Sequence, residues 1–118
     1  MAFLSCGPRR DFSAARDILD ENVVRSGTGG HKSGRDEYLA YLESVMQDAV
    51  GYQYNVKRCL ESKDGRTVVV EIDESLTQAD GTELAVSEAM VFDLNPAGQI
   101  TRITVYGGGE DERRPCGG

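Results

Sequence analysis

The sequence predicts an α+β domain in which helices come first and an antiparallel sheet follows. Apolar residues recur at helical spacing over residues 33–48, and they alternate with polar residues along four later runs between residues 51 and 106. The runs are separated by turn-forming sequences, Lys63-Asp64-Gly65, Ala79-Asp80-Gly81 and Asn95-Pro96-Ala97-Gly98. Four alternating runs joined by short turns predict a four-stranded antiparallel meander.

Length and charge limit the classes of protein to consider. The chain has 118 residues, which suits one domain, expected over residues 1–106 with residues 1–10 irregular and 107–118 a flexible glycine-rich tail. The net charge of −7 argues against nucleic acid and anionic membranes as partners, since both are bound by basic surfaces. We find no apolar run long enough to cross a bilayer.

The three cysteines are far apart in the sequence, and the chain has a single histidine. Neither a zinc site nor a disulfide framework is indicated, so we expect no metal and no cofactor. Free thiols are typical of a reducing compartment, and the cytoplasm is the expected location.

The N-terminal half is expected to hold two helices and a short strand. Asp11 can cap a helix over residues 12–20, which a strand over residues 21–26 follows. The next residues, GTGGHK, predict a loop. Ser33 is expected to begin a longer helix that ends near residue 48, with Asp36 completing a capping box.

The C-terminal strands are expected over residues 51–62, 66–76, 81–94 and 99–106. Alternate residues of a strand share a face. Along the first of these strands the residues on one face are apolar or aromatic, namely Tyr52, Tyr54, Val56 and Leu60.

The third of these strands carries a single acid in an apolar face, which reads Leu84, Val86, Glu88, Met90, Phe92 and Leu94. An isolated carboxylate in such a face must be paired, protonated or solvated by a cavity. Glu88 is therefore a candidate pocket group. The alternative is a structural ion pair with Arg25 or Arg58.

The length of the loop before this strand decides which residue neighbours Glu88. A three-residue loop over residues 79–81 places Ile72 opposite Glu88 and makes Glu74 its diagonal neighbour. The pKa of one of two close carboxylates should rise, which suits a general base. A two-residue turn would instead place Asp73 opposite Glu88. Glu74 could also be solvated, because it lies near the strand end.

Other polar residues have open roles. Arg25 could pair with Glu88, bind an anionic ligand or be solvated at the sheet edge, and His31 is expected on the surface. Four tyrosines could present hydroxyl groups to a ligand or pack in the core: Tyr38, Tyr41, Tyr52 and Tyr54.

Two segments in this order, SGRDEYLAYL at 33–42 and VFDLNPAGQITRITVY at 91–106, resemble the nuclear transport factor 2-like superfamily, nearest its SnoaL-like and ketosteroid-isomerase-like group. The resemblance covers roughly residues 12–106. It implies a cone-shaped fold, in which a curved antiparallel sheet, made of the meander and a short N-terminal strand, wraps around two or more helices and leaves a largely apolar pocket. Members include isomerases, cyclases, dehydratases, epoxide hydrolases and non-enzymatic binders, and many are dimers through the sheet.

The chain departs from the patterns of this group's enzymes. Arg25 stands where the isomerase-type base would lie. Met90 stands near the position of the isomerase-type oxyanion acid, one same-face step from Glu88. No acid stands around residues 106–108, where the cyclase-type acid would fall. The family's first helix is absent or rudimentary here, which leaves the pocket more open unless residues 1–10 or a partner chain cover it.

We therefore expect a homodimeric pocket protein for a small, mostly apolar organic molecule. Glu88 could carry out cofactor-independent acid–base chemistry as an isomerase, cyclase or hydrolase, with Arg25 or Tyr54 as polar partner. The alternatives are a non-catalytic binding or dimerisation module and a protein–protein scaffold. The further residues expected to contact the ligand are Glu74, Met90, Phe92, Ile103, Val105, Tyr38 and Leu42.

Overall fold

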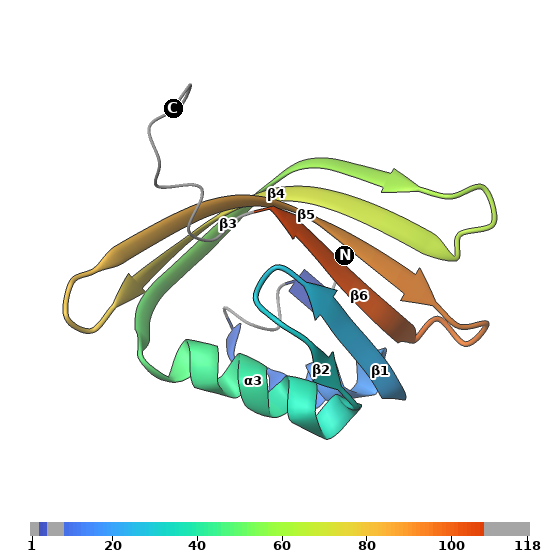
Figure 1. The fold of residues 1–118 in the computed structure, drawn as a ribbon, viewed down its shortest axis with the longest axis horizontal. Coiled ribbons are helices and arrows are strands. Elements are labelled where there is room, and N and C mark those ends of the chain that lie inside the picture. Colours follow the sequence, from blue (N-terminus) through green and yellow to red (C-terminus); the bar gives the residue numbers. More distant parts are fainter. Residues whose placement is uncertain (1–2, 5–8, 108–118) are drawn as a thin grey trace.

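A computed structural model describes residues 3–4 and 9–107 of the chain. Figure 1 shows a curved sheet that arches over helix α3. The elements in order are α2 (Phe12–Ile18), β1 (Leu19–Gly27), β2 (Lys32–Ser33), α3 (Arg35–Gln47), β3 (Ala49–Glu61), β4 (Thr67–Gln78), β5 (Glu83–Leu94) and β6 (Ile100–Gly107). The α+β class and the cone-shaped arrangement are confirmed.

The strands form one six-stranded sheet in the order β2-β1-β6-β5-β4-β3. Strands β3 to β6 pair with their neighbours antiparallel, which is the predicted meander. Strand β1 pairs with β6 in parallel, so the sheet is mixed. This pairing joins the first strand to the last and brings residues around Arg25 beside Ile103.

The predicted register of the second hairpin is confirmed. Ile72 lies opposite Glu88, and Glu74 lies opposite Val86. The Gln78 amide donates to the Thr82 carbonyl at 2.8 Å, which closes a three-residue loop over residues 79–81. The alternative pairing of Asp73 with Glu88 is therefore wrong, and Asp73 lies opposite Ser87.

A bulge changes the face of one residue in β3. The register shifts between Val56 and Arg58, so Leu60 lies opposite Val69 rather than opposite an inward residue of β4. An extra residue in one strand reverses the alternation beyond it. Leu60 is consequently 53% exposed, and its predicted placement on the same face as Tyr52 is wrong.

The N-terminal elements differ from their predicted bounds. Helix α2 ends at Ile18, because Leu19 already belongs to β1 and lies opposite Ile100, fully buried. Residues 32–33, expected in the loop and at the helix start, form strand β2 against β1. Gly34 is the N-cap of α3 instead of Ser33.

The predicted capping box of α3 is displaced by one residue. The Glu37 carboxylate, not that of Asp36, accepts a hydrogen bond from the Ser33 amide at 2.6 Å. Asp36 instead pairs with Arg16 of α2, 2.7 Å away.

Glu37→Ala is expected to lower the free energy of unfolding by about 0.5–1 kcal/mol, because the Ser33 amide loses its acceptor at the helix start. Urea unfolding followed by circular dichroism measures this. Glu43→Ala, an exposed change in the middle of the same helix, is the matched control and should stay within about 0.5 kcal/mol of the wild type. Equal unfolding midpoints for the two variants would contradict the capping role.

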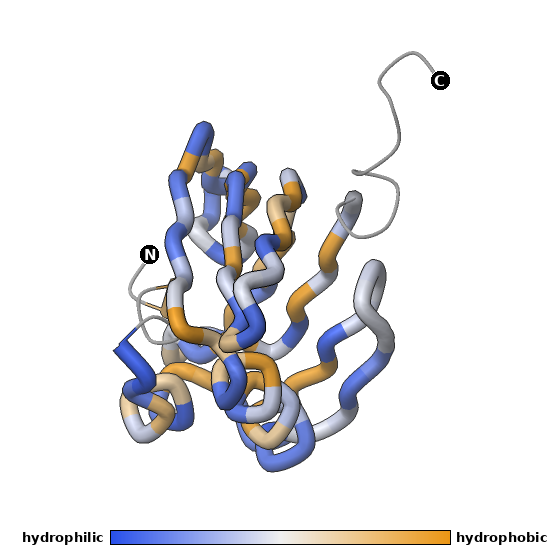
Figure 2. Tube along the Cα trace, turned by 90° about the vertical axis from the view of Figure 1, so that its left-hand side faces the viewer, coloured by the Kyte–Doolittle hydropathy of each residue, from blue (hydrophilic) through white to orange (hydrophobic). Residues whose placement is uncertain are grey.

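The core lies between the concave face of the sheet and the helices. Figure 2 shows hydrophobic and hydrophilic residues alternating along the strands, as a sheet with one buried face requires. The large side chains buried completely come from four strands, β1, β4, β5 and β6, and are Phe92, Leu19, Ile72, Ile100, Ile103, Val23 and Val70.

The N-terminal segment contributes to this core. Phe3, Leu4 and Arg9 are helical, so the prediction that residues 1–10 are irregular is wrong for these three. The ring of Phe3 packs against Tyr38 and Phe92, with centroids 6.3 and 6.0 Å apart. The rest of that prediction for residues 1–2 and 5–8, and the predicted tail over residues 108–118, lie outside the described residues. Within those described, none of the helices has the length and apolarity to cross a membrane.

Candidate functional site

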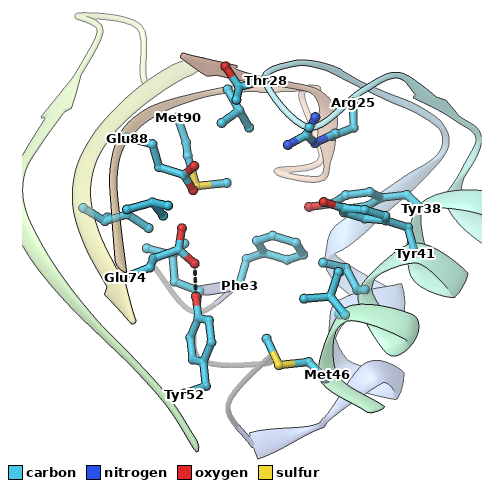
Figure 3. Close-up of a pocket in the computed structure, with 18 of the residues that line it drawn as sticks. Phe3, Arg25, Thr28, Tyr38, Tyr41, Met46, Tyr52, Glu74, Glu88 and Met90 are labelled. Atoms are coloured by element: carbon cyan, nitrogen blue, oxygen red, sulfur yellow. Dashed lines mark hydrogen bonds between the residues drawn. The ribbon is translucent and has the colours of Figure 1, made fainter. Parts of the chain in front are cut away.

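A cavity of about 290 Å³ lies between α3 and the concave face of the sheet (Figure 3). Such a volume is near the lower end of the range for small-molecule sites. Most of the wall is apolar. Its lining residues are Phe3, Leu4, Phe12, Ala15, Arg25, Thr28, Gly29, Tyr38, Tyr41, Leu42, Val45, Met46, Tyr52, Ile72, Glu74, Val86, Glu88, Met90 and Val105.

Seven of the ten site residues expected from the sequence line this cavity, namely Glu88, Arg25, Glu74, Met90, Val105, Tyr38 and Leu42. The other three do not. Phe92 and Ile103 are 0% exposed and belong to the core, because Phe3 and the helices close over their part of the sheet. Tyr54 lines a separate groove beside Asn55 and Ser87, and the residue of β3 that reaches the cavity is Tyr52.

Glu74 and Glu88 come from adjacent strands and both point into the cavity (Figure 3). The pKa of Glu88 is raised from 4.5 to about 8, and burial is the largest cause. The hydrogen bond and the negative charge of Glu74 contribute to the same rise, while the charge of Arg25 acts in the opposite direction with the smallest effect. Glu88 is therefore mostly protonated at neutral pH, beside a second carboxylate.

Tyr52 holds the second carboxylate in place. Its hydroxyl group donates a hydrogen bond to Glu74, drawn as the dashed line in Figure 3. Burial, followed by the charge of Glu74 and this hydrogen bond, raises the pKa of Tyr52, so the phenol remains a donor. The arrangement can hold one proton on Glu88 beside the negative charge of Glu74.

Arg25 lies on the opposite side of the cavity, next to Tyr38 and Tyr41 (Figure 3). It is only 7% exposed, so the prediction of a solvated edge arginine is wrong. One guanidinium nitrogen, Nη1, donates to the Gly30 carbonyl at 2.6 Å, and the guanidinium carbon lies 5.8 Å from the centroid of the Tyr41 ring.

The predicted ion pair of Glu88 with Arg25 or Arg58 is not formed. In the part of the chain that the structure describes, no carboxylate lies within ion-pair distance of Arg25, and Arg58 pairs with Glu71. Arg58 lies after the β3 bulge, on an exposed part of the sheet.

The loop after β1 forms one wall of the site. The Thr28 amide donates to the Val105 carbonyl at 2.9 Å, which holds the loop against β6. Thr28 and Gly29 line the cavity, and a Cβ atom on Gly29 would lie 2.9 Å from Nη2 of Arg25. The backbone of Gly29 therefore packs directly on the guanidinium group.

Sequence reasoning missed several lining residues. Val45 and Met46 continue the apolar stripe of α3, so their helical spacing could have identified them. Thr28 and Gly29 belong to a loop that was given no role, and Phe3 and Leu4 come from a segment without periodicity. Across residues 3–4 and 9–107, no three His, Cys, Asp or Glu side chains are grouped to hold a metal ion.

Comparison with known proteins agrees with this architecture. The SnoaL-like domain family matches residues 2–103. Curated proteins yield no match. Three solved structures that are similar to this chain each cover most of it.

The first is an NTF2-like protein of unknown function from Cytophaga hutchinsonii, with 25% identity and a TM-score of 0.71 over 89% of this chain and 82% of that one. An LEH-like epoxide hydrolase from M. tuberculosis has 23% identity and a TM-score of 0.76 over 90% and 73%. The epoxide hydrolase/cyclase-like enzyme SalBIII, which acts in pyran ring formation in the polyether salinomycin, has 20% identity and a TM-score of 0.80 over 93% and 87%.

Proposed function

Because the chain belongs to the SnoaL-like domain family, we propose that its cavity binds a small, mostly apolar organic molecule and that Glu88 transfers a proton to or from it. The fold alone does not specify a reaction, so the proposal rests on the side chains of the site. The observation that carries it is the Glu74–Glu88 pair set in an otherwise largely apolar wall.

Glu88 can perform both tasks of acid–base chemistry, and Glu74 adjusts its pKa. Protonated Glu88 can give its proton to a ligand oxygen or carbon, and its ionised form can take one back. A pKa of about 8 keeps the protonated and the ionised form of Glu88 accessible near neutral pH. An acid–base group is most effective when its pKa lies near the working pH. The negative charge of Glu74, which Tyr52 holds in place, favours the protonated form of Glu88.

Isomerisation, cyclisation and hydrolysis each require a proton to be given to the substrate and another to be removed. A single carboxyl group on an apolar wall can serve all three, since the substrate decides which atom receives the proton. In this proposal Tyr52 takes the place that the sequence suggested for Tyr54, and it acts by positioning Glu74.

Glu88→Gln is expected to change the affinity of a cavity ligand by about ten-fold or more, because the amide cannot exchange a proton and carries a fixed dipole. A library of small ketones, lactones and epoxides can be screened by ligand-observed NMR against the full chain. Turnover of any hit should fall by about 10²–10⁴ in this variant.

Glu83→Gln is the matched control, since Glu83 lies exposed on the same strand and undergoes the same change of side chain. It should leave affinity and turnover unchanged. Hits that bind all three proteins equally would remove Glu88 from the site. Hits that the wild type binds through Glu88 but never converts would favour a binding module without catalysis.

We also propose that two copies of the chain associate through the outer face of the sheet. Leu60 and Tyr106 support this, since they are 53% and 58% exposed and lie opposite the outward residues Val69 and Ala89.

A further inference from the structure

Arg25 is an unusual group to find in the wall of an apolar cavity. A buried charge is costly unless it is paired and hydrogen-bonded. Arg25 is 7% exposed, yet no carboxylate among residues 3–4 and 9–107 lies within ion-pair distance of it. Its positive charge thus faces the cavity without an anionic partner from this part of the chain.

The guanidinium group is held in a fixed position. The Gly30 carbonyl accepts from Nη1, the guanidinium carbon lies over the Tyr41 ring, and the Gly29 backbone packs against Nη2. An arginine carries five N–H donors. Only the bond to Gly30 is formed within the described residues, so donors remain for a group inside the cavity.

Further donors lie on the same side. The hydroxyl groups of Tyr38 and Tyr41 point into the cavity below Arg25 (Figure 3). Burial raises the pKa of Tyr38, so its phenol stays protonated and can donate. Glu74 and Glu88 lie across the cavity from this cluster (Figure 3), which leaves the Arg25 side electropositive and the glutamate side able to exchange protons.

We propose that Arg25 receives a carboxylate group of the ligand, so that the molecule bound in this cavity is a small organic acid with an apolar body. The two carboxylate oxygens match the planar fork of a guanidinium group, and the tyrosine hydroxyls can donate to the remaining lone pairs. The apolar body then lies along the wall formed by Leu42, Ile72 and Met90, and its far end reaches Glu88. This inference rests on the proposed function, because it names the chemical class that the same cavity takes.

The test uses two probes of equal shape, 3-phenylpropanoate and its uncharged amide 3-phenylpropanamide. Their affinities for the full chain are measured by NMR titration at pH 7. The wild type is expected to bind the acid at least about ten-fold more tightly than the amide, because hydrogen bonds to a charged group are stronger than those to a neutral one. Arg25→Gln should weaken acid binding by about ten-fold or more and leave amide binding within about two-fold.

Arg102→Gln is the matched control. Arg102 is exposed on β6, and its substitution changes the net charge by the same amount. The preference for the acid should persist in this variant. Equal binding of acid and amide by the wild type, failure of both probes to bind, or an acid preference that survives Arg25→Gln would each overturn the proposal.

Arg25→Lys covers the case in which the glutamine variant does not fold. It retains the charge and loses the planar fork, so the acid preference should fall by a few-fold, and an unchanged preference would count against a carboxylate held by the fork. The outcomes also separate the two proposals. Neutral ligands that depend on Glu88 without any acid preference would leave the proposed function standing and remove the carboxylate receptor. An acid preference that depends on Arg25, with no ligand sensitive to Glu88→Gln, would support the carboxylate receptor and remove the proposed role of Glu88.

Discussion

Gly27→Ala is expected to lower the free energy of unfolding by about 3 kcal/mol or more, the largest effect of any substitution considered for this chain. Gly27 has a φ of +98°, in the region that side chains with a Cβ avoid. It ends β1 opposite Val105 of β6, and a Cβ atom there would lie 2.0 Å from the Val105 carbonyl oxygen. The parallel pairing of the first and last strands must separate to admit a methyl group.

Urea unfolding of Gly27→Ala and Gly30→Ala separates the cost of the positive φ from the cost of the contact with Val105. Gly30 has a similar φ of +105°, but a Cβ atom there would meet nothing within 4 Å. Gly30→Ala therefore measures the conformational cost alone, about 1–2 kcal/mol. If the two variants lose equal stability, the contact with Val105 is not what requires a glycine at position 27.

The stability of the wild type is expected to fall between about pH 5 and pH 8, and Glu88→Gln should remove most of that fall. In the native state Glu88 holds its proton up to about pH 8, whereas the unfolded chain releases it near 4.5. The native state thus binds more protons over this range, so the free energy of unfolding decreases as the pH rises and becomes level above the native pKa. Since Glu88 is partly exposed, solvent screening reduces the effect, and we expect about 2 kcal/mol.

Thermal and urea unfolding at pH 5, 7 and 9 can measure this difference. At pH 9 Glu88→Gln should be more stable than the wild type by about 2 kcal/mol, and near pH 5 the two should agree closely. Glu83→Gln should follow the wild-type curve. The lowered pKa values of Asp64, Asp73 and Asp80, caused first by their hydrogen bonds to Ser62, Ser87 and Thr82, act at more acidic pH and leave this window undisturbed. Parallel curves for the wild type and Glu88→Gln would show that Glu88 ionises at its ordinary pKa.

The prediction of the Glu74–Glu88 pair succeeded because it depended only on local rules. Strand parity places Glu88 among apolar neighbours, and the length of the loop over residues 79–81 sets which residues of β4 lie opposite β5. Both properties involve residues that are close in sequence. The same holds for the apolar stripe of α3, which correctly supplied Tyr38 and Leu42 to the cavity wall.

The errors in the site arise where distant segments meet. Tyr52 and Tyr54 have the same parity, and only the curvature of the sheet and the position of the cavity select Tyr52. Phe92 and Ile103 face the interior as predicted, but Phe3 and the helices bury them beyond the reach of a ligand. The β3 bulge, which exposes Leu60, could not be predicted because no turn-forming residue marks its position in the sequence.

The sequence alone therefore determined the α+β class, the meander and the acid within the apolar face, and it limited the register of the second hairpin to two alternatives, because alternation and turn length are properties of neighbouring residues. The tertiary structure decided that Arg25 is buried without a carboxylate partner among the described residues and that it faces the two glutamates across a cavity. Those relations depend on the parallel pairing of β1 with β6 and on the placement of α3 beneath the sheet. The burial of Arg25 is set by segments far away in the chain, and no local pattern around it indicates that burial.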